Sequence, residues 1–351
     1  MYKLVRWILF LFNSDKIHHI TIKFLRGLKR FRIFTPLFRL LYNYRDPLLE
    51  KEIFGVKFKN PVGLASGFDY NGDCYNLLSD FGFGFIELGT ITPQPQQRED
   101  KHSILFFPKN ETVISKREYQ NLGVKHTVNY LKKTKPNCVI GVNIASNLTT
   151  TQLANILKDY ELAFEYLYDF VDYFAINVED YESPDKKGIS SLSEFSELLD
   201  SLLTIRNMYD EYRPILLKVS PDLSEQQLDE VIDTALVSGL DGIIATNSTN
   251  KISDYIAHDS KVAQKAQGGR LSGDKLFDHS LLVVKYINGR TKGQLPIIAC
   301  GGITTPARAK MMLDAGASLI QINTGFIYKG PRLVRNINRY IAKDLRVTSN
   351  R

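Results

Sequence analysis

Two stretches near the end of the chain, Leu295-Pro-Ile-Ile-Ala-Cys-Gly-Gly-Ile303 and Ala317-Ser-Leu-Ile-Gln-Ile-Asn-Thr-Gly-Phe326, decide the fold. Each stretch is a short apolar run, as in a strand buried on both faces, and each run closes on small residues. Backbone N–H groups in such turns bind phosphate after the last two strands of a (β/α)8 barrel. The two stretches therefore predict a phosphorylated ligand at the carboxyl end of a barrel.

The rest of the chain repeats the same unit, since apolar runs alternate with helical stretches from residue 60 onward. Residues 224–238, for example, open on a helix start signal and end at Gly239. This alternation predicts a parallel sheet covered by helices. An open doubly wound sheet shows the same alternation, but eight runs with the phosphate turns at the end favour a closed (β/α)8 TIM barrel. The expected strands are 62–65, 85–88, 139–143, 173–177, 215–219, 242–246, 296–299 and 319–322.

The 351 residues exceed the roughly 250 that such a barrel needs, and the surplus lies at the front. Residues 1–44 hold nine Lys and Arg side chains against one acidic residue, Asp15, which gives them a net charge of +8. Because the whole chain carries +7, residues 45–351 carry −1. The basic character therefore reports the N-terminal extension and does not predict that the barrel binds nucleic acid.

The N-terminal extension shows an amphipathic helical pattern. A bilayer span needs about 20 apolar residues, so the run 7–12 is too short, and no signal-peptide cleavage pattern follows it. We predict that residues 1–44 form a helical domain on an anionic membrane surface and that residues 45–351 form the barrel. The alternative is a helical cap on the barrel with a solvated basic face. The apolar positions at helical spacing are Ile17, Ile20, Phe24, Leu28, Phe34, Leu37, Phe38 and Leu41.

The cysteines and histidines point to no metal site. Cys74, Cys138 and Cys300 show no metal-ligand spacing, and an odd number is poor material for a disulfide framework. The six histidines are scattered without a metal-binding motif. We therefore expect a reducing compartment and a peripheral protein on the cytoplasmic side of a membrane.

The polar residues at the strand ends are expected to carry the chemistry, because barrel active sites are built there. Lys218 stands near the end of the apolar run 215–219, where a charge is costly unless an anion or an electron-rich ring is its partner. A lysine among amides and hydroxyls, with a phosphate cradle nearby, suits flavin mononucleotide (FMN), whose ring becomes anionic on reduction. A Schiff-base lysine and a structural, salt-bridged lysine are the alternatives.

Seven longer motifs occur in order over essentially the whole chain. They are Asn60-Pro-Val-Gly-Leu-Ala-Ser-Gly-Phe-Asp69, Glu87-Leu-Gly-Thr-Ile-Thr-Pro-Gln-Pro95, Asn121-Leu-Gly-Val124, Lys218-Val-Ser-Pro-Asp-Leu-Ser224, Ala245-Thr-Asn-Ser-Thr249, Gly269-Arg-Leu-Ser-Gly273 and Gln321-Ile-Asn-Thr-Gly-Phe-Ile-Tyr-Lys-Gly-Pro331. Together they look like quinone-dependent (class 2) dihydroorotate dehydrogenase. The resemblance implies a bound FMN, a hydride taken from C6 of dihydroorotate, a proton taken from C5 by a loop base, and reoxidation by ubiquinone or menaquinone. It also implies that the basic N-terminal helices form a membrane dock and a quinone tunnel.

The same resemblance implies a role for individual residues. Asn177, Asn247 and Ser248 match the family's contacts with orotate. The positions implied to contact FMN are Ala65, Ser66, Thr90, Asn143, Asn177, Lys218, Thr246, Gly273, Gly302, Asn323 and Thr324.

The substrate half of the site departs from the family's pattern. Asp180 stands at the position of the family's serine base, and Glu182 stands at a substrate-binding asparagine. Tyr70 replaces a lysine of the family. The run Ser-Lys-Arg-Glu-Tyr replaces Asn-Arg-Met-Gly-Phe, which places Ser115 and Tyr119 at the substrate.

These substitutions remove a cation and add carboxylates where an anionic substrate binds. Two like charges about 4 Å apart repel by roughly 4 kcal/mol at an effective dielectric constant near 20. We therefore expect impaired or changed use of dihydroorotate. Three functions stay open: a working dihydroorotate dehydrogenase with a rewired loop, a flavin oxidoreductase for another small molecule, and a non-catalytic binding protein at the membrane surface.

Overall fold

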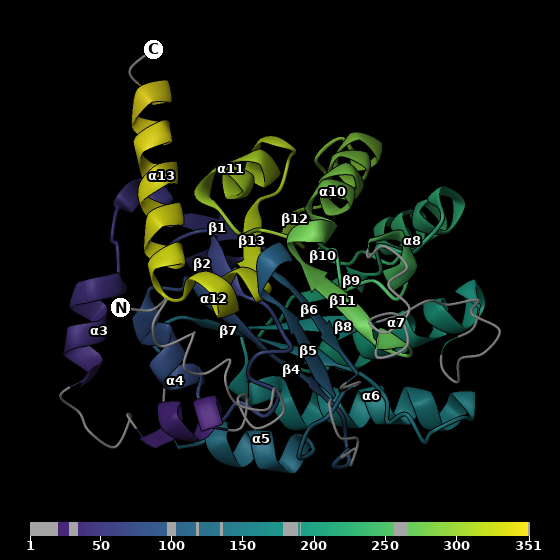
Figure 1. The fold of residues 1–351 in the computed structure, drawn as a ribbon. Helices are drawn as coiled ribbons and strands as arrows, with labels where there is room; N and C mark the ends of the chain where they lie inside the picture. The colour runs from purple at the N-terminus through teal and green to yellow at the C-terminus, as the bar shows by residue number, and fades with distance from the viewer. Residues whose placement is uncertain are drawn as a thin grey trace.

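Eight parallel strands close into a barrel, in which each strand pairs with the next along the chain and the last pairs with the first (Figure 1). The computed structural model describes residues 20–27, 34–96, 103–116, 119–133, 136–177, 189, 191–255 and 266–349. The expected (β/α)8 barrel is confirmed, with strand ends that shift by at most three residues. The strands are β3 (Val62–Leu64), β4 (Phe85–Ile91), β7 (Val139–Ile144), β8 (Tyr173–Asn177), β9 (Ile215–Val219), β10 (Gly242–Ala245), β12 (Ile297–Cys300) and β13 (Leu319–Ile322).

Helices surround the barrel, as the alternating pattern predicts. The helix expected at 224–238 is present, and a capping box fixes its start: Ser224 Oγ accepts from the Gln227 backbone N–H at 3.2 Å, and Gln227 Oε1 accepts from the Ser224 backbone N–H at 2.9 Å. The helices are α4 (Tyr75–Leu78), α5 (Val124–Leu131), α6 (Leu153–Leu167), α7 (Leu192–Arg206), α8 (Glu225–Val237), α10 (Phe277–Thr291), α11 (Pro306–Asp314), α12 (Thr324–Lys329) and α13 (Arg332–Ser349).

Side chains fill the barrel interior because every second strand residue points inward. Phe85 and Tyr173 belong to the layer of side chains that fills the barrel at the amino ends of its strands. Each ring takes the space beside a glycine of the neighbouring strand. A Cβ on Gly63 would lie 2.3 Å from the Phe85 ring, and one on Gly141 would lie 2.0 Å from the Tyr173 ring. Phe58 closes the layer, with its ring centroid 5.3 Å from that of Phe85. The other members are Ala175, Leu216, Ile244, Ile298 and Leu319.

Two residues further along the strands, the inward positions become polar. Glu87 follows Phe85 on β4, Lys218 follows Leu216 on β9, and Gln321 follows Leu319 on β13. All three side chains are buried. The barrel is therefore apolar at the amino ends of its strands and polar towards their carboxyl ends, where barrel active sites lie.

A three-stranded antiparallel sheet, which the sequence pattern did not predict, adds a wall at the carboxyl end. It consists of β5 (Ile104–Phe107), β6 (Thr112–Ser115) and β11 (Arg270–Gly273), in the order β11-β6-β5. Ile114 and Leu271 face one side and are buried in a small apolar cluster. The alternate residues of β6 and β11 face the other side, because successive strand residues point to opposite faces.

Two helical segments precede the barrel: residues 20–27 and α3 (Phe34–Tyr42). α3 packs through Phe38, whose ring centroid lies 5.2 Å from that of Phe81, and through Arg39 Nε, which lies 2.6 Å from Asp80 Oδ1. Its Leu40 is 78% exposed. None of the helices within the described ranges has the length and apolar character to cross a bilayer. A short hairpin of β1 (Lys51–Ile53) and β2 (Val56–Phe58) then leads into the barrel.

Candidate active site

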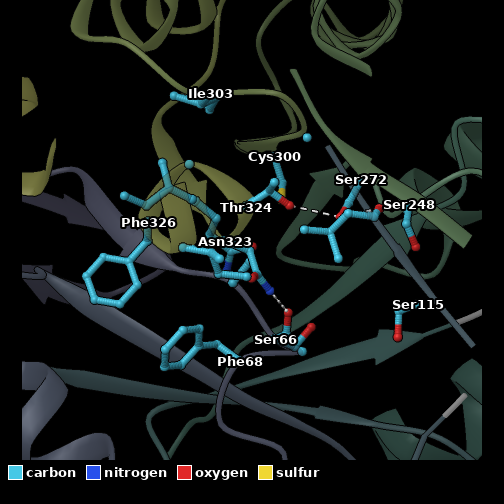
Figure 2. A pocket seen from close by; sticks show the side chains of 18 of the residues that line it. Ser66, Phe68, Ser115, Ser248, Ser272, Cys300, Ile303, Asn323, Thr324 and Phe326 are labelled. Atoms are coloured by element: carbon cyan, nitrogen blue, oxygen red, sulfur yellow. Dashed lines mark hydrogen bonds between the residues drawn. The ribbon is translucent and has the colours of Figure 1, made fainter. Parts of the chain in front are cut away.

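A cavity of about 580 Å³ lies at the carboxyl end of the barrel (Figure 2). Its wall combines the strand ends of the barrel, one face of the β5-β6-β11 sheet, and apolar side chains from residues 20–27 and α3. The volume falls within the range of about 300–1,000 Å³ that is typical of ligand and cofactor sites. The cavity thus joins three parts of the chain that are far apart in the sequence.

The structure brings the predicted flavin contacts together. Ten of the eleven predicted contacts line the cavity. The eleventh, Asn143, is bonded to one of them, because its Oδ1 accepts a hydrogen bond from Thr90 Oγ1 at 2.7 Å. Asn143 Nδ2 is buried and has no hydrogen-bond partner within the described protein. Such a buried donor costs free energy unless a ligand accepts from it. The other ten line the cavity: Ala65, Ser66, Thr90, Asn177, Lys218, Thr246, Gly273, Gly302, Asn323 and Thr324.

The two glycine turns that decided the fold meet at one end of this cavity. Gly301 and Gly302 follow β12 with φ angles of +117° and +64°, in the region that favours glycine. A Cβ on Gly302 would lie 2.5 Å from the backbone of Phe277, so only glycine fits there. From the second turn, Thr324 Oγ1 lies 2.9 Å from Ser272 Oγ (Figure 2). The backbone and hydroxyl groups of both turns line this end of the cavity, as expected for a phosphate cradle.

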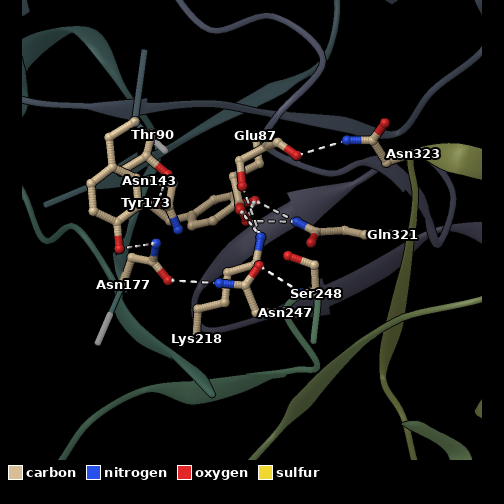
Figure 3. Close-up of polar contacts among 12 residues, drawn as sticks. Glu87, Thr90, Asn143, Tyr173, Asn177, Lys218, Asn247, Ser248, Gln321 and Asn323 are labelled. Carbon is tan, nitrogen blue, oxygen red and sulfur yellow. Dashed lines mark hydrogen bonds and ion pairs between the residues drawn. The ribbon is translucent and has the colours of Figure 1, made fainter. Parts of the chain in front are cut away.

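Lys218 enters the cavity wall from a buried polar cluster (Figure 3). Its Nζ lies 2.8 Å from Glu87 Oε1 and donates to Ser66 Oγ at 2.8 Å. Glu87 Oε2 accepts from Gln321 Nε2 at 2.7 Å and from the Tyr173 hydroxyl at 3.3 Å. Burial, and then the charge of Glu87, raise the pKa of Tyr173 well above its ordinary value, so this phenol stays a donor. The cluster fixes the ammonium group at the wall.

Glu87 was missed as a functional residue, although the sequence carried a signal. The run 85–88 holds a single carboxylate within an apolar strand, just as the run 215–219 holds a single ammonium group. Two lone opposite charges on barrel strands predict a buried pair. This pairing disfavours the Schiff-base alternative for Lys218, because a lysine that forms an imine has to lose its proton.

The predicted substrate contacts gather at the other end of the cavity. Asn247 Nδ2 donates to Asn177 Oδ1 at 3.1 Å (Figure 3). Asn177 Nδ2 donates to the Tyr119 hydroxyl at 3.1 Å. The remaining predicted contacts on the described chain, Tyr70, Ser115 and Ser248, line the same cavity.

Comparison with known proteins decides the family. The family profile described as dihydroorotate dehydrogenase matches residues 48–345. The chain is 40% identical over 343 residues to a dihydroorotate dehydrogenase (quinone) from Christiangramia forsetii, which covers 97% of this chain and 98% of that protein. It is 38% identical over 345 residues to one from Vibrio parahaemolyticus, which covers 96% of this chain and 98% of that protein. This chain belongs to the dihydroorotate dehydrogenase family.

Solved structures agree. A crystal structure of DHODH from Eimeria tenella in complex with ferulenol superimposes with a TM-score of 0.82 at 27% identity, over 96% of this chain and 92% of that one. The ligand-free form superimposes with a TM-score of 0.78 at 28% identity, over 90% of this chain and 94% of that one. The resemblance drawn from the seven motifs is confirmed.

In this member of the dihydroorotate dehydrogenase family, the end of the cavity with the predicted substrate contacts holds a cation to which the sequence assigned no role. Arg270 is 8% exposed and lines the cavity. Its Nε donates to Ser248 Oγ at 3.1 Å, and its Nη2 donates to the Ser248 carbonyl oxygen at 2.6 Å. Arg270 lies in the motif Gly269-Arg-Leu-Ser-Gly273, but the sequence assigned a role only to Gly273 of that motif. Only the pairing of β11 with β6 turns it inward.

Arg270 supplies a positive charge at the end of the cavity where the substitution at Tyr70 was expected to remove one. Among the described residues that line the cavity, Lys218 and Arg270 carry positive charge and none is acidic. Asp180 and Glu182 lie outside the described residues, so their assignment to the base and substrate positions stays a prediction.

Proposed function

We propose that this chain oxidises dihydroorotate to orotate, with FMN as its cofactor and a membrane quinone as the electron acceptor. The observation that carries the proposal is the convergence of the flavin and substrate positions on one cavity, in a chain of this family. Bound FMN supplies the group that accepts hydride from the substrate and returns the electrons to an acceptor. The protein binds and orients the reactants, excludes water and handles the proton.

The residues around the cavity fit FMN. Gly273, Gly302 and Thr324 would hold its phosphate through backbone N–H groups and a hydroxyl. Asn143 offers a buried Nδ2 donor that the protein itself leaves unsatisfied. Lys218 offers a fixed ammonium group that favours negative charge on the ring. Cation, amide donor and glycine cradle are the three kinds of group that an anionic flavin nucleotide requires.

At the substrate end, Asn177, Asn247 and Ser248 would orient dihydroorotate, because side-chain amides and hydroxyls both donate and accept hydrogen bonds. Asp180 would take the proton from C5. A carboxyl group with an ordinary pKa of about 3.9 is ionised near neutral pH and is therefore able to accept a proton. Loss of the C5 proton and the C6 hydride leaves the C5–C6 double bond of orotate.

The apolar arm of the cavity is the proposed route for the quinone. Phe24, Leu25 and Phe38 line this arm, which joins the predicted flavin site to the two N-terminal helical segments. On the same segments, Phe24 is 63% and Leu40 is 78% exposed. Basic residues of 1–44 would attract an anionic lipid surface around these apolar side chains. We therefore propose residues 1–44 as a membrane-docking domain of a peripheral protein on the cytoplasmic side of the membrane.

Growth of a pyrimidine auxotroph that lacks dihydroorotate dehydrogenase tests the proposal. The wild-type gene on a plasmid should restore growth without uracil, and the Lys218→Ala gene should not, at equal protein level. Failure of the wild-type gene, with a yellow purified protein, would favour a flavin oxidoreductase for another substrate. Failure with a colourless protein would favour a non-catalytic protein at the membrane surface.

A further inference from the structure

We infer that Arg270 is the anion-binding residue of the substrate end, and that its guanidinium holds the substrate carboxylate in place of the family's lysine at Tyr70. The inference rests on the proposed function and deepens it. It names the side chain that makes the site select an anionic over a neutral pyrimidine.

The β5-β6-β11 sheet directs Arg270 into the cavity. Arg270 lies directly opposite Ser115 in the β11–β6 register, and side chains of directly opposed residues share a face. Ser272 and Val113, two residues along each strand, are also directly opposed and also line the cavity. Leu271 between them turns away into the apolar cluster. The period of two along β11 therefore fixes the side on which the guanidinium lies.

Along this strand, Arg270 is placed at the substrate end and not at the phosphate end. Gly273, a predicted phosphate contact, lies three residues further along β11, or about 10 Å at the usual rise of a strand. Arg270 instead bonds twice to Ser248. Ser248 follows Asn247, whose Nδ2 donates to Asn177 Oδ1 at 3.1 Å. The guanidinium thus continues the row of amides and hydroxyls that the sequence assigns to orotate.

The charges of the wall favour an anion at this place. The described lining residues include two cations, Lys218 and Arg270, and no acidic side chain. Ser248 orients the guanidinium of Arg270 through its hydroxyl and its carbonyl oxygen. A guanidinium presents parallel N–H groups that match a carboxylate. Burial of Arg270 strengthens such a contact, because less water competes for it.

The test compares orotate with methyl orotate, which keeps the ring but has no negative charge. Both are titrated into the full-length protein in detergent, and binding is followed through the visible absorption of the flavin. We expect Arg270→Gln to weaken orotate binding about 10- to 100-fold, as for loss of a charge-assisted hydrogen bond, and to leave methyl orotate binding unchanged. Tyr70→Lys, added to Arg270→Gln, should restore part of the orotate affinity. Arg290→Gln, which removes an exposed arginine on α10, is the matched control and should change neither.

The outcomes separate this inference from the proposed function. Unchanged orotate affinity in Arg270→Gln, with full flavin content, would overturn the inference and leave the proposed function standing. Loss of FMN from that variant would place the guanidinium on the cofactor and would also overturn it. If Arg270→Gln does not fold, Arg270→Met keeps the length of the side chain without its charge, and unchanged orotate binding there would overturn the inference. A wild-type flavoprotein that binds neither compound would reject the proposed function itself.

Discussion

Glu87 and Lys218 form an ion pair inside the barrel, with Oε1 and Nζ 2.8 Å apart and side chains that are 0% and 4% exposed. A buried pair adds little net stability, because desolvation of the two charges offsets their attraction. The pair instead fixes the position of the ammonium group. Ser66 bonds to Lys218 and Gln321 bonds to Glu87, so the ammonium group is held at one place in the cavity wall. The pair lies between the apolar layer at the amino ends of the strands and the cavity at their carboxyl ends.

Removal of one partner of this pair should be costly. Glu87→Gln keeps the size of the side chain but leaves the ammonium group buried without its counter-charge, so we expect a loss of about 3 kcal/mol in the free energy of unfolding. Denaturant titration measures it. The double variant Glu87→Gln with Lys218→Met should recover much of the loss, since neither charge remains. Equal stability of the wild type and Glu87→Gln would show that the pair is absent.

Asn143 should contribute to flavin affinity more than to stability. Its Nδ2 has no partner within the described protein, so we expect Asn143→Ala to raise the dissociation constant of FMN about tenfold, the effect of one hydrogen bond. Fluorescence of the released flavin measures this constant. Asn338→Ala is the matched control, because Asn338 is equally buried on α13 and has an unsatisfied Oδ1. A similar rise in the dissociation constant of FMN in both variants would mean that Asn143 has a structural role only.

Leu40 on α3 should contact the membrane. A glutamate there opposes insertion into an anionic lipid surface, so Leu40→Glu should lower cosedimentation with phosphatidylglycerol–phosphatidylcholine vesicles several-fold. Leu282→Glu changes a leucine on the barrel helix α10 that is also well exposed, at 63% against 78%, and should bind vesicles like the wild type. Equal vesicle binding by both variants would argue against docking through α3.

Asp69 should make stability depend on pH. Burial raises its pKa to about 6 from an ordinary 3.8, although the backbone N–H groups of Asp73 and Cys74 oppose the shift. Because the folded state holds this proton more tightly than the unfolded state, its stability contribution is complete below about pH 3.8 and is lost as the pH rises to about 6. The turn that Asp69 holds carries Tyr70 into the cavity wall.

Asp69→Asn removes this titration. The unfolding free energy of the wild type minus that of Asp69→Asn should therefore fall by about 2 to 3 kcal/mol between pH 4 and pH 6. Denaturant titrations at half-unit steps measure the difference. Asp210→Asn, which removes an exposed carboxylate, serves as the control. A flat difference over this range would mean that Asp69 is not protonated in the folded protein at pH 5.

The barrel was predictable because its strands are continuous apolar runs with polar ends. The expected ranges 173–177, 215–219 and 319–322 match β8, β9 and β13 to the residue. β4 runs on to Ile91, past the expected end at residue 88, because Gly89 and Thr90 continue the strand although neither residue is strongly hydrophobic. The place of β11 in the β5-β6-β11 sheet was missed because β11 pairs with a strand more than 150 residues earlier in the chain.

The site was predictable where a motif carries its residues and unpredictable where a contact is made across the fold. Ser66, Lys218 and Thr324 came from strand ends and motifs, and the structure brings them to one cavity. Glu87 and Arg270 also lie in motifs, but neither received a role, because Glu87 pairs with Lys218 on a distant strand and the pairing of β11 with β6 turns Arg270 inward. Burial of Arg270 in the cavity wall depends on the β11–β6 register, which no local pattern reports.

The most direct measurement is anaerobic addition of dihydroorotate to the detergent-purified, full-length protein, with the visible absorption of its flavin recorded. The proposed function predicts a yellow protein that bleaches on addition of dihydroorotate and regains its colour when a soluble quinone is added. A protein that stays yellow in excess dihydroorotate would contradict it, since the flavin would then be present without accepting hydride from this substrate.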